Sequence, residues 1–291
     1  MALSTTPVDI NRGTEGLILP EQLSNEIWAG AIEQSAVMQL AERIELPGSG
    51  IAIPVITGDP VAQFVAESTE KPVSTGTFST KTMKACKLAV IEPFSNEFMR
   101  DYARLYDELV RRLPGAIAKA FDATVFGTTA PGTGFDVLGN STAKAIDPQT
   151  AYADMVGVIE TLGAADASLT GIAASAQAQA LFLSAVDGAG RPLFSDSPES
   201  GRLGRILGAD VVKAQAAYAA GTPNTVAYAG DWSQARYGIV NGINISVSDQ
   251  ATLNDGEHLI HLWQRNMSAV RIEAEVGFVV RNAGAFVKLT D

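Results

Sequence analysis

The chain has 291 residues, enough for one large domain or two smaller ones with a sizeable hydrophobic core. Its formal net charge is -11, which argues against a surface built to grip nucleic acid, because phosphate binding needs clustered Lys and Arg, although an acidic wall could still lie beside DNA. Charged residues make up only 18% of the chain and hydrophobic ones 46%, so we expect other subunits to cover part of the surface; an Ala-rich globular protein is the alternative. With one cysteine, Cys86, no intrachain disulfide can form, which fits a reducing cytoplasm.

Residues 1–20 predict an extended arm, because proline and glycine recur there and break regular structure. No basic region followed by an apolar run is present, so no signal peptide is predicted. Residues 20–41 have the apolar spacing of a helix. Residues 51–56, "IAIPVI", predict a short strand whose proline suits the edge of a sheet.

A long polar hairpin is the most unusual prediction. Residues 61–66 and 85–94 are apolar and predict the strands at its root, whereas residues 67–84 contain only two large apolar side chains, Phe78 and Met83. From position 51 to 91 each arm has about 20 residues and can reach roughly 65 Å when extended. An isolated hairpin is marginally stable in water, so we expect another molecule to supply its packing surface; a floppy hairpin is the alternative.

The remaining sequence predicts helices first and strands later. Residues 98–121 form an amphipathic pattern, inside which Pro114 is expected to bend or restart the helix. Two further helices, a glycine-rich loop and several strands follow, in this order: helices at 152–165 and 175–186, the loop at 187–208, and strands at 211–212, 226–229, 236–249 and 268–289. Helices and strands are segregated rather than regularly alternating, so the predicted fold class is α+β.

The sequence gives little support to an enzyme. His258 and His261 could hold a metal ion only if their segment were helical, and they are the only two histidines. No G-x-S-x-G elbow, phosphate-binding loop or dinucleotide loop is present, and Cys86 is predicted to be a small buried hydrophobe. We therefore predict no catalytic, cofactor-binding or metal site, and keep a soluble hydrolase using His258 or His261 as a remote alternative.

Several segments, in this order, carry a resemblance to a known family. They are "IAIPVITGDPVAQFVAES", "TGTF", "VIEPFSNEFMRD", "GRPLF", "LGADVV", "AGDWSQARYGI" and "LWQRNMSAVRIEAEVGFVV". Their order and spacing resemble the major capsid proteins of tailed bacteriophages, which have the Hong Kong 97 fold. The resemblance extends from about position 16 to position 289.

The resemblance implies a division of the chain into four parts. These are an N-terminal arm with the start of the first helix (1–29), a peripheral domain with a long spine helix (30–50, 92–149 and 244–276), an extended loop that lies across a neighbouring subunit (51–91), and an axial domain (150–243 and 277–291). It also implies self-assembly through hexamers and pentamers into an icosahedral shell around double-stranded DNA. An encapsulin-type nanocompartment, which shares the fold, is the alternative.

The resemblance also implies where subunits touch and what else takes part. The candidate contact residues are Phe64, Glu67, Lys71, Phe78, Arg191, Arg202, Arg205, Arg271 and Glu273. A solvated face is an equal reading for Arg271 and Glu273. Portal and scaffolding proteins are the expected partners, a decoration protein is left open, and no membrane partner is expected. Assembly is expected in the bacterial host cytoplasm and the final location in the virion capsid.

Two features of that family are expected to be missing. The chain starts with Met1 about 20 residues before the first predicted helix, so we expect no N-terminal scaffolding segment; either this is the processed form or another protein provides the scaffold. No motif fixes an acceptor for covalent cross-links, although four lysines lie in or near the loop, so no cross-linking is expected. These lysines are Lys71, Lys81, Lys84 and Lys87.

Overall fold

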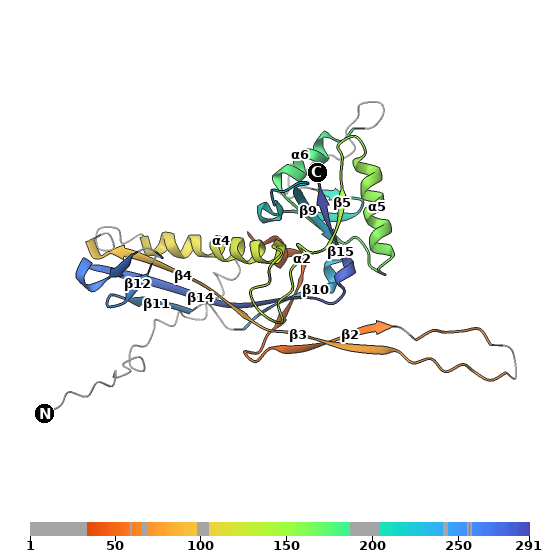
Figure 1. Ribbon diagram of the computed structural model, residues 1–291, viewed down its shortest axis with the longest axis horizontal. Coiled ribbons are helices and arrows are strands. Elements are labelled where there is room, and N and C mark those ends of the chain that lie inside the picture. Colours follow the sequence, from red (N-terminus) through yellow and green to blue (C-terminus); the bar gives the residue numbers. More distant parts are fainter. Residues whose placement is uncertain are drawn as a thin grey trace.

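The computed structural model describes residues 34–58, 60–65, 69–97, 105–186, 204–240, 244–254, 256 and 258–291. These residues form a five-stranded sheet with a long helix beside it, a six-stranded sheet with two helices, and a hairpin that projects away from both (Figure 1). Most of the predicted first helix lies outside the described residues. No helix of the described part is long and apolar enough to cross a membrane.

The five-stranded sheet is organised around β14 (Met267–Val280). One side of β14 pairs with β4 (Cys86–Ser95), and the other pairs with β10 (Ala235–Ile239) and then β11 (Asn244–Ser248), all antiparallel. Strand β1 (Glu42–Glu45) joins β10 in parallel. Along β14 buried apolar residues alternate with more exposed charged ones, as predicted for a half-buried strand.

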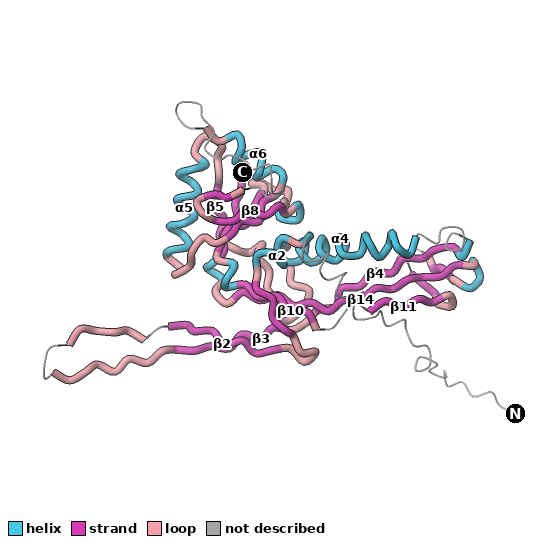
Figure 2. Tube along the Cα trace, turned by 180° about the vertical axis from the view of Figure 1, so that it is seen from behind, coloured by secondary structure: helices cyan, strands magenta, loops and turns pink. Residues whose placement is uncertain are grey.

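Helix α4 (Leu105–Phe126) runs beside this sheet (Figures 1 and 2). Near its end Phe121 is buried, and its ring centroid lies 6.3, 6.5 and 6.4 Å from those of Phe135, Tyr237 and Phe278. Burying one such side chain contributes about 1.5–3 kcal/mol to folding. The structure has a single helix across Pro114, so the proline does not restart it; a bend at that position stays a prediction.

A short helix, α2 (Ala36–Leu40), is attached to α4 through one buried carboxylate. Asp122 accepts hydrogen bonds from Ser35 Oγ at 2.5 Å and from the backbone N–H of Ala36 at 2.9 Å. Ser35 also caps the helix by accepting from the N–H of Met38 at 3.1 Å. Burial raises the pKa of Asp122 to about 6, although these hydrogen bonds oppose the shift.

The six-stranded sheet has the strand order β5-β15-β9-β6-β8-β7. In that order the strands are Thr142–Ala145, Phe286–Thr290, Thr225–Gly230, Gly171–Ala174, Ala209–Lys213 and Arg205–Ile206. Helices α5 (Ala151–Gly163) and α6 (Ala176–Ser184) share one buried apolar core with this sheet. On its other face Tyr228 stacks on Phe126 of α4, with ring centroids 4.8 Å apart, so the two sheets are joined by packing.

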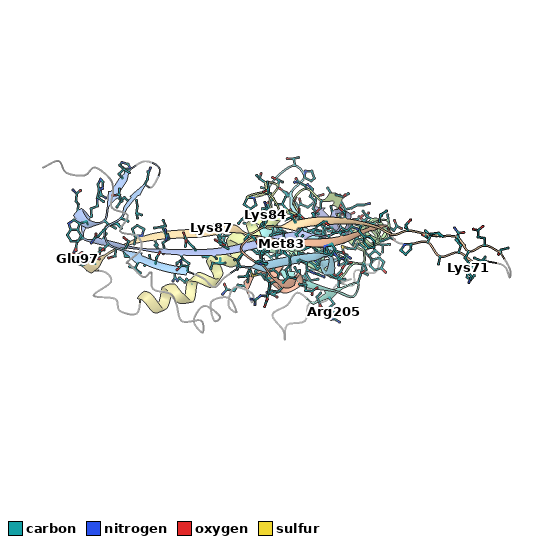
Figure 3. The ribbon with its side chains drawn as sticks, turned by 90° about the horizontal axis from the view of Figure 1, so that it is seen from below. Lys71, Met83, Lys84, Lys87, Glu97 and Arg205 are labelled. Carbon is teal, nitrogen blue, oxygen red and sulfur yellow. The ribbon has the colours of Figure 1, made fainter. Side chains whose placement is uncertain are left out.

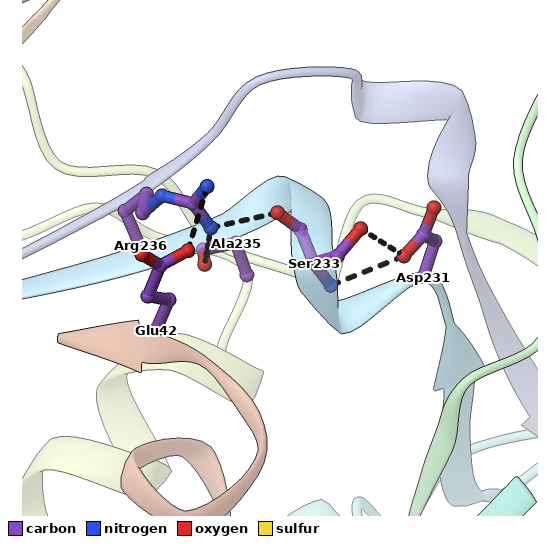
Figure 4. Close-up of polar contacts among 5 residues, drawn as sticks. All are labelled: Glu42, Asp231, Ser233, Ala235 and Arg236. Carbon is purple, nitrogen blue, oxygen red and sulfur yellow. Dashed lines mark hydrogen bonds and ion pairs between the residues drawn. The ribbon is translucent and has the colours of Figure 1, made fainter.

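The connection from β9 to β10 joins the two sheets and is held by polar contacts (Figure 4). Arg236 forms an ion pair with Glu42 of β1, with Nη2 2.8 Å from Oε2, and donates from Nη1 to the Ser233 carbonyl at 2.7 Å. Asp231 accepts from the N–H and Oγ of Ser233 at 3.1 and 2.6 Å. These contacts fix the turn η3 (Trp232–Gln234) at which the chain passes between the sheets.

Short elements complete the described fold. Strands β12 (Thr252–Asn254) and β13 (Leu259–His261) form a two-stranded sheet, and the 3-10 turns η2, η4 and η5 span Gln215–Ala217, Trp263–Arg265 and Ala283–Ala285.

The projecting hairpin consists of β2 (Ile51–Gly58) and β3 (Thr77–Met83), paired antiparallel. The prediction that residues 61–66 and 85–94 form its root was wrong. Residues 61–65 lie beyond the ladder, and β4 pairs with β14 over ten residue pairs. A central strand of the main sheet gives β4 a far longer partner than a lone hairpin could, and local sequence patterns do not reveal that distant partner.

Strand pairing groups two short segments differently from the predicted division into domains. Strand β5, expected with the peripheral segment 92–149, pairs with β15 in the six-stranded sheet. Strand β10, expected with the axial segment 150–243, pairs with β14. Both pairings join segments more than 35 residues apart, which a local pattern cannot show. The domain boundaries as a whole stay a prediction.

Candidate subunit interface

The outer part of the hairpin extends beyond its hydrogen-bonded ladder. The ladder ends where Gly58 pairs with Thr77, and the two arms then continue as extended chain. A hydrogen bond from the N–H of Val61 to Ser74 Oγ at 2.7 Å still joins them. Nearer the tip the arms line an open hollow of about 450 Å³ formed by Gln63, Phe64, Val65, Thr69, Glu70, Lys71, Pro72 and Val73. We call the described residues 60–65 and 69–76 the distal arm.

The distal arm and the adjoining strand β3 expose large apolar side chains. Phe64 is 110% exposed, Val73 94%, Phe78 74% and Val61 65%, so no described part of the chain covers them. Figure 3 places Lys71 near the tip of the hairpin and Glu97 at the opposite end of the molecule. Apolar side chains held this far from the body mark a surface for another molecule.

The root of the hairpin, in contrast, is packed firmly against the body. Met83 is fully buried and clusters with Leu46 and Val279. Gly277 of β14 permits this approach, since a Cβ there would lie only 2.9 Å from Leu46 Cδ2. The root therefore belongs to the folded core.

A charged contact also anchors the root. Lys81 Nζ lies 2.6 Å from Asp136 Oδ2 and donates to the Val280 carbonyl at 2.7 Å. Asp136 in turn accepts from the N–H of Val280 at 2.8 Å. Strand β3 is thus tied to the end of β14, which sets the direction in which the distal arm projects.

The structure places the predicted contact residues in different regions. Phe64, Lys71 and Phe78 lie on the hairpin and are exposed. The residues Glu67, Arg191 and Arg202 lie outside the described part of the chain.

The remaining three predicted contact residues have partners within their own chain. Arg205 is exposed and forms an ion pair with Asp210, 2.7 Å from Nε to Oδ1. Arg271 Nε lies 3.5 Å from Glu273 Oε1 and donates to Ser246 Oγ at 3.1 Å. Salt bridges this exposed contribute little to folding, so these side chains stay available for another subunit.

A second exposed apolar region was not predicted from the sequence. At the end of the molecule opposite the hairpin, Trp263 is 72% exposed, Leu259 57% and Val247 48%. The segment "HLIHLW" contains this tryptophan and leucine, but the predictions for it concerned only its two histidines, as metal ligands or as catalytic residues of a hydrolase. His261 lies in a strand, and its Nδ1 is 3.0 Å from Thr252 Oγ1.

The described residues contain no group of three or more His, Cys, Asp or Glu placed to hold a metal ion. The segment of His258 and His261 is not helical, which was the condition for a metal site on that pair. Cys86 is partly buried on β4, and burial raises the pKa of its thiol, which disfavours the reactive thiolate.

The architecture matches solved capsid structures. A chain from Gordonia phage Cozz superposes with a TM-score of 0.69 at 21% identity, covering 88% of this chain and 86% of that one. A chain from Microbacterium phage Oxtober96 gives 0.70 at 18% identity, covering 88% and 91%. The fold is the α+β Hong Kong 97-like capsid fold, as predicted.

Sequence comparison gives the family. The model of the phage capsid family matches residues 15–291. The probable major capsid protein gp17 of Mycobacterium phage L5 is 34% identical over 95% of this chain and 90% of its own length. The chain belongs to the phage capsid family, and the resemblance stated from the motifs is confirmed.

Proposed function

We propose that this chain is the structural unit of an icosahedral head, built from hexamers and pentamers, that encloses the double-stranded DNA of a tailed phage. The observation that carries the proposal is the hairpin: its root is fixed to the body, and its distal arm exposes apolar side chains to which the described chain offers no cover. A neighbouring copy supplies the missing surface.

Such a contact joins two different surfaces, the distal arm of one copy and the body of the next. Contacts of this heterologous kind close into rings when the rotation between copies fits a whole turn. Each buried Phe or Val of the arm contributes about 1.5–3 kcal/mol, and the contribution recurs at every copy. Many weak contacts of this size stabilise a shell although none would hold a dimer alone.

The charge of the chain suits a container. At a net charge of -11 the protein repels a polyanion on average, so DNA is enclosed without sequence-specific binding. We propose a purely structural role, with portal and scaffolding proteins as further partners, a decoration protein left open, assembly in the host cytoplasm and the virion capsid as the final location. The absence of an intrachain disulfide agrees with assembly in a reducing compartment.

The test is electron microscopy of the protein expressed alone and together with the other head genes of its phage. The wild type is expected to form capsomer rings or closed polyhedral shells. Replacing residues 59–76 by a two-residue Asn-Gly turn retains both strands of the ladder, Lys81 included, and is expected to leave a folded subunit that closes no shells.

A second variant tests the apolar side chains while it keeps the length of the arm. Phe64 and Val73 of the arm and Phe78 of β3 are changed together to Ser, which retains the backbone and removes the three most exposed large apolar side chains of the hairpin. Normal shells from both variants would disprove the role of the arm, and a wild type that stays monomeric or dimeric under both conditions contradicts the whole proposal. Particles that contain protein cargo in place of DNA would favour the nanocompartment.

A further inference from the structure

Helix α5 exposes apolar side chains beside its buried face. Its inner face is buried in the core of the six-stranded sheet, through Met155, Val158 and Leu162. On one flank of the helix, about 95° around from that face at 3.6 residues per turn, Tyr152, Val156 and Ile159 are 52%, 38% and 40% exposed. Their spacing of four and three residues places them in one stripe. The described part of the chain leaves this stripe open, so it is suited to being covered.

The opposite flank of the same domain has a second group of exposed apolar residues. Leu183 ends the outer side of α6, Val186 follows it, and Leu207 lies in the turn between β7 and β8; they are 44%, 45% and 37% exposed. Leu207 has a φ of +50° and Gly208 a φ of +85°. Such two-residue turns favour Asn, Asp and Gly, so a leucine there places an apolar side chain in solvent at a conformational cost.

The α5 stripe and the turn that carries Leu207 lie toward opposite edges of the six-stranded sheet. Strand β5, which leads into α5, is one edge strand of the sheet, and β7 is the other. Five strand spacings of about 4.8 Å separate these edges by roughly 24 Å. Both views of the molecule place α5 and α6 on different sides of the domain (Figures 1 and 2). Two unlike surfaces on opposite flanks are what a head-to-tail ring requires.

The charges on the two flanks are complementary. Helix α5 carries Asp154 and Glu160 and no Lys or Arg, and the neighbouring β5 carries one lysine, Lys144. The other flank presents exposed Arg205 and Lys213, of which Arg205 shares its charge with Asp210. Charges at the rim of an apolar contact contribute mainly to its orientation and to the choice of partner.

We infer that, within a capsomer ring, the α5 stripe of one copy packs against the flank formed by α6 and the β7–β8 turn of the next copy. This inference rests on the proposed function, since it requires rings, and it adds a second contact between neighbouring copies to that of the distal arm. The occupant of each flank is therefore a second copy of this chain, oriented head to tail.

The test uses thiol cross-linking between copies. Val156→Cys and Leu183→Cys are made on separate chains, co-assembled, and treated with a short bismaleimide. We expect a linked pair only when both variants are present, because the contact joins unlike surfaces. A chain that carries both substitutions is expected to give a ladder that ends at five and six linked copies in denaturing gels. Wild-type protein measures the background from Cys86.

The control replaces Leu183→Cys by Leu259→Cys, an equally large and exposed leucine at the far end of the five-stranded sheet. We expect no link between this variant and Val156→Cys. Links formed by Val156→Cys alone would show that two α5 helices pack together, which overturns the inference. Rings visible by microscopy without the Val156–Leu183 link also overturn it, while the proposed function stands. If no rings form in any sample, both fail.

Discussion

The two parts of the hairpin have opposite surroundings although they are continuous in the chain. At the root Met83 is fully buried against Leu46, whereas on the distal arm Phe64 and Val73 are almost completely exposed. The root contributes to the folding of one subunit, and under the proposed function the arm contributes when another copy covers it. That proposal predicts that folding and assembly depend on different residues of one element, so that substitutions can separate them.

The largest effect on folding is expected from Met83→Ala at the root. It removes a buried side chain from a small apolar cluster, so the free energy of unfolding should fall by about 2–5 kcal/mol. Urea unfolding of unassembled subunits measures the change. Val73→Ala on the distal arm is the control, with an expected change within about 0.5 kcal/mol. Equal losses at both sites would remove the distinction between root and arm.

The second largest effect on the free energy of unfolding is expected from the titration of Asp122, which is buried in the body of the subunit. Asp122 has a pKa of about 6 in the folded chain against 3.8 ordinarily, so the folded state binds more protons between these values. Its contribution to stability is complete below about pH 4 and is lost as the pH rises through about 6, a change of about 3 kcal/mol at most.

The conservative variant Asp122→Asn isolates this effect. An amide cannot titrate, yet its oxygen still accepts a hydrogen bond from the Ser35 hydroxyl or the Ala36 N–H. Denaturant unfolding measured across this pH range should lose most of its pH dependence in the variant. An unchanged slope would assign the dependence to other groups.

A smaller effect is expected where the arm is anchored. Lys81→Met removes the ion pair with Asp136 and the hydrogen bond to the Val280 carbonyl. Both side chains are about one third exposed, so the loss in unfolding free energy should be about 1 kcal/mol. Assembly should suffer more than folding, because the direction of the arm is no longer fixed. The shell yield, measured by light scattering, is compared with the free energy of unfolding. A proportionate loss of both would contradict the anchoring role of Lys81.

The smallest effect on folding and a large one on assembly are expected from Phe78→Ser. The side chain is 74% exposed, so unfolding should change by less than about 0.5 kcal/mol. If a neighbouring copy covers it, losing about 1.5–3 kcal/mol per contact raises the protein concentration needed for assembly about tenfold or more. The exposed residue Thr80 on the same strand provides the control, Thr80→Ala, which should leave the threshold unchanged. If Phe78→Ser assembles at the same protein concentration as Thr80→Ala, Phe78 lies outside any contact.

The sequence predicted those features that depend on local pattern. Helices α5 and α6 each begin within a residue of the predicted start, and β14 alternates as expected. It failed where a partner is distant: β4 was assigned to the hairpin, because nothing near residues 86–95 shows that β14 pairs with them. The sequence singled out Phe78, since an apolar ring amid polar residues is a local signal, and the structure exposes it; its part in a subunit contact stays a prediction. The exposure of Trp263 was not predicted, because the predictions for its segment concerned the neighbouring histidines.

The pairing of β4 with β14 also bears on how the subunit is made. The paired positions of β4 and β14 are 172 to 190 residues apart, and those of β1 and β10 are 194 residues apart. During synthesis a ribosome must therefore complete nearly the whole chain before the five-stranded sheet can form, and until then β4 remains an unpaired strand in the crowded cell. Truncated translation products cannot fold this sheet. Under the proposed function, only nearly complete chains can join a particle.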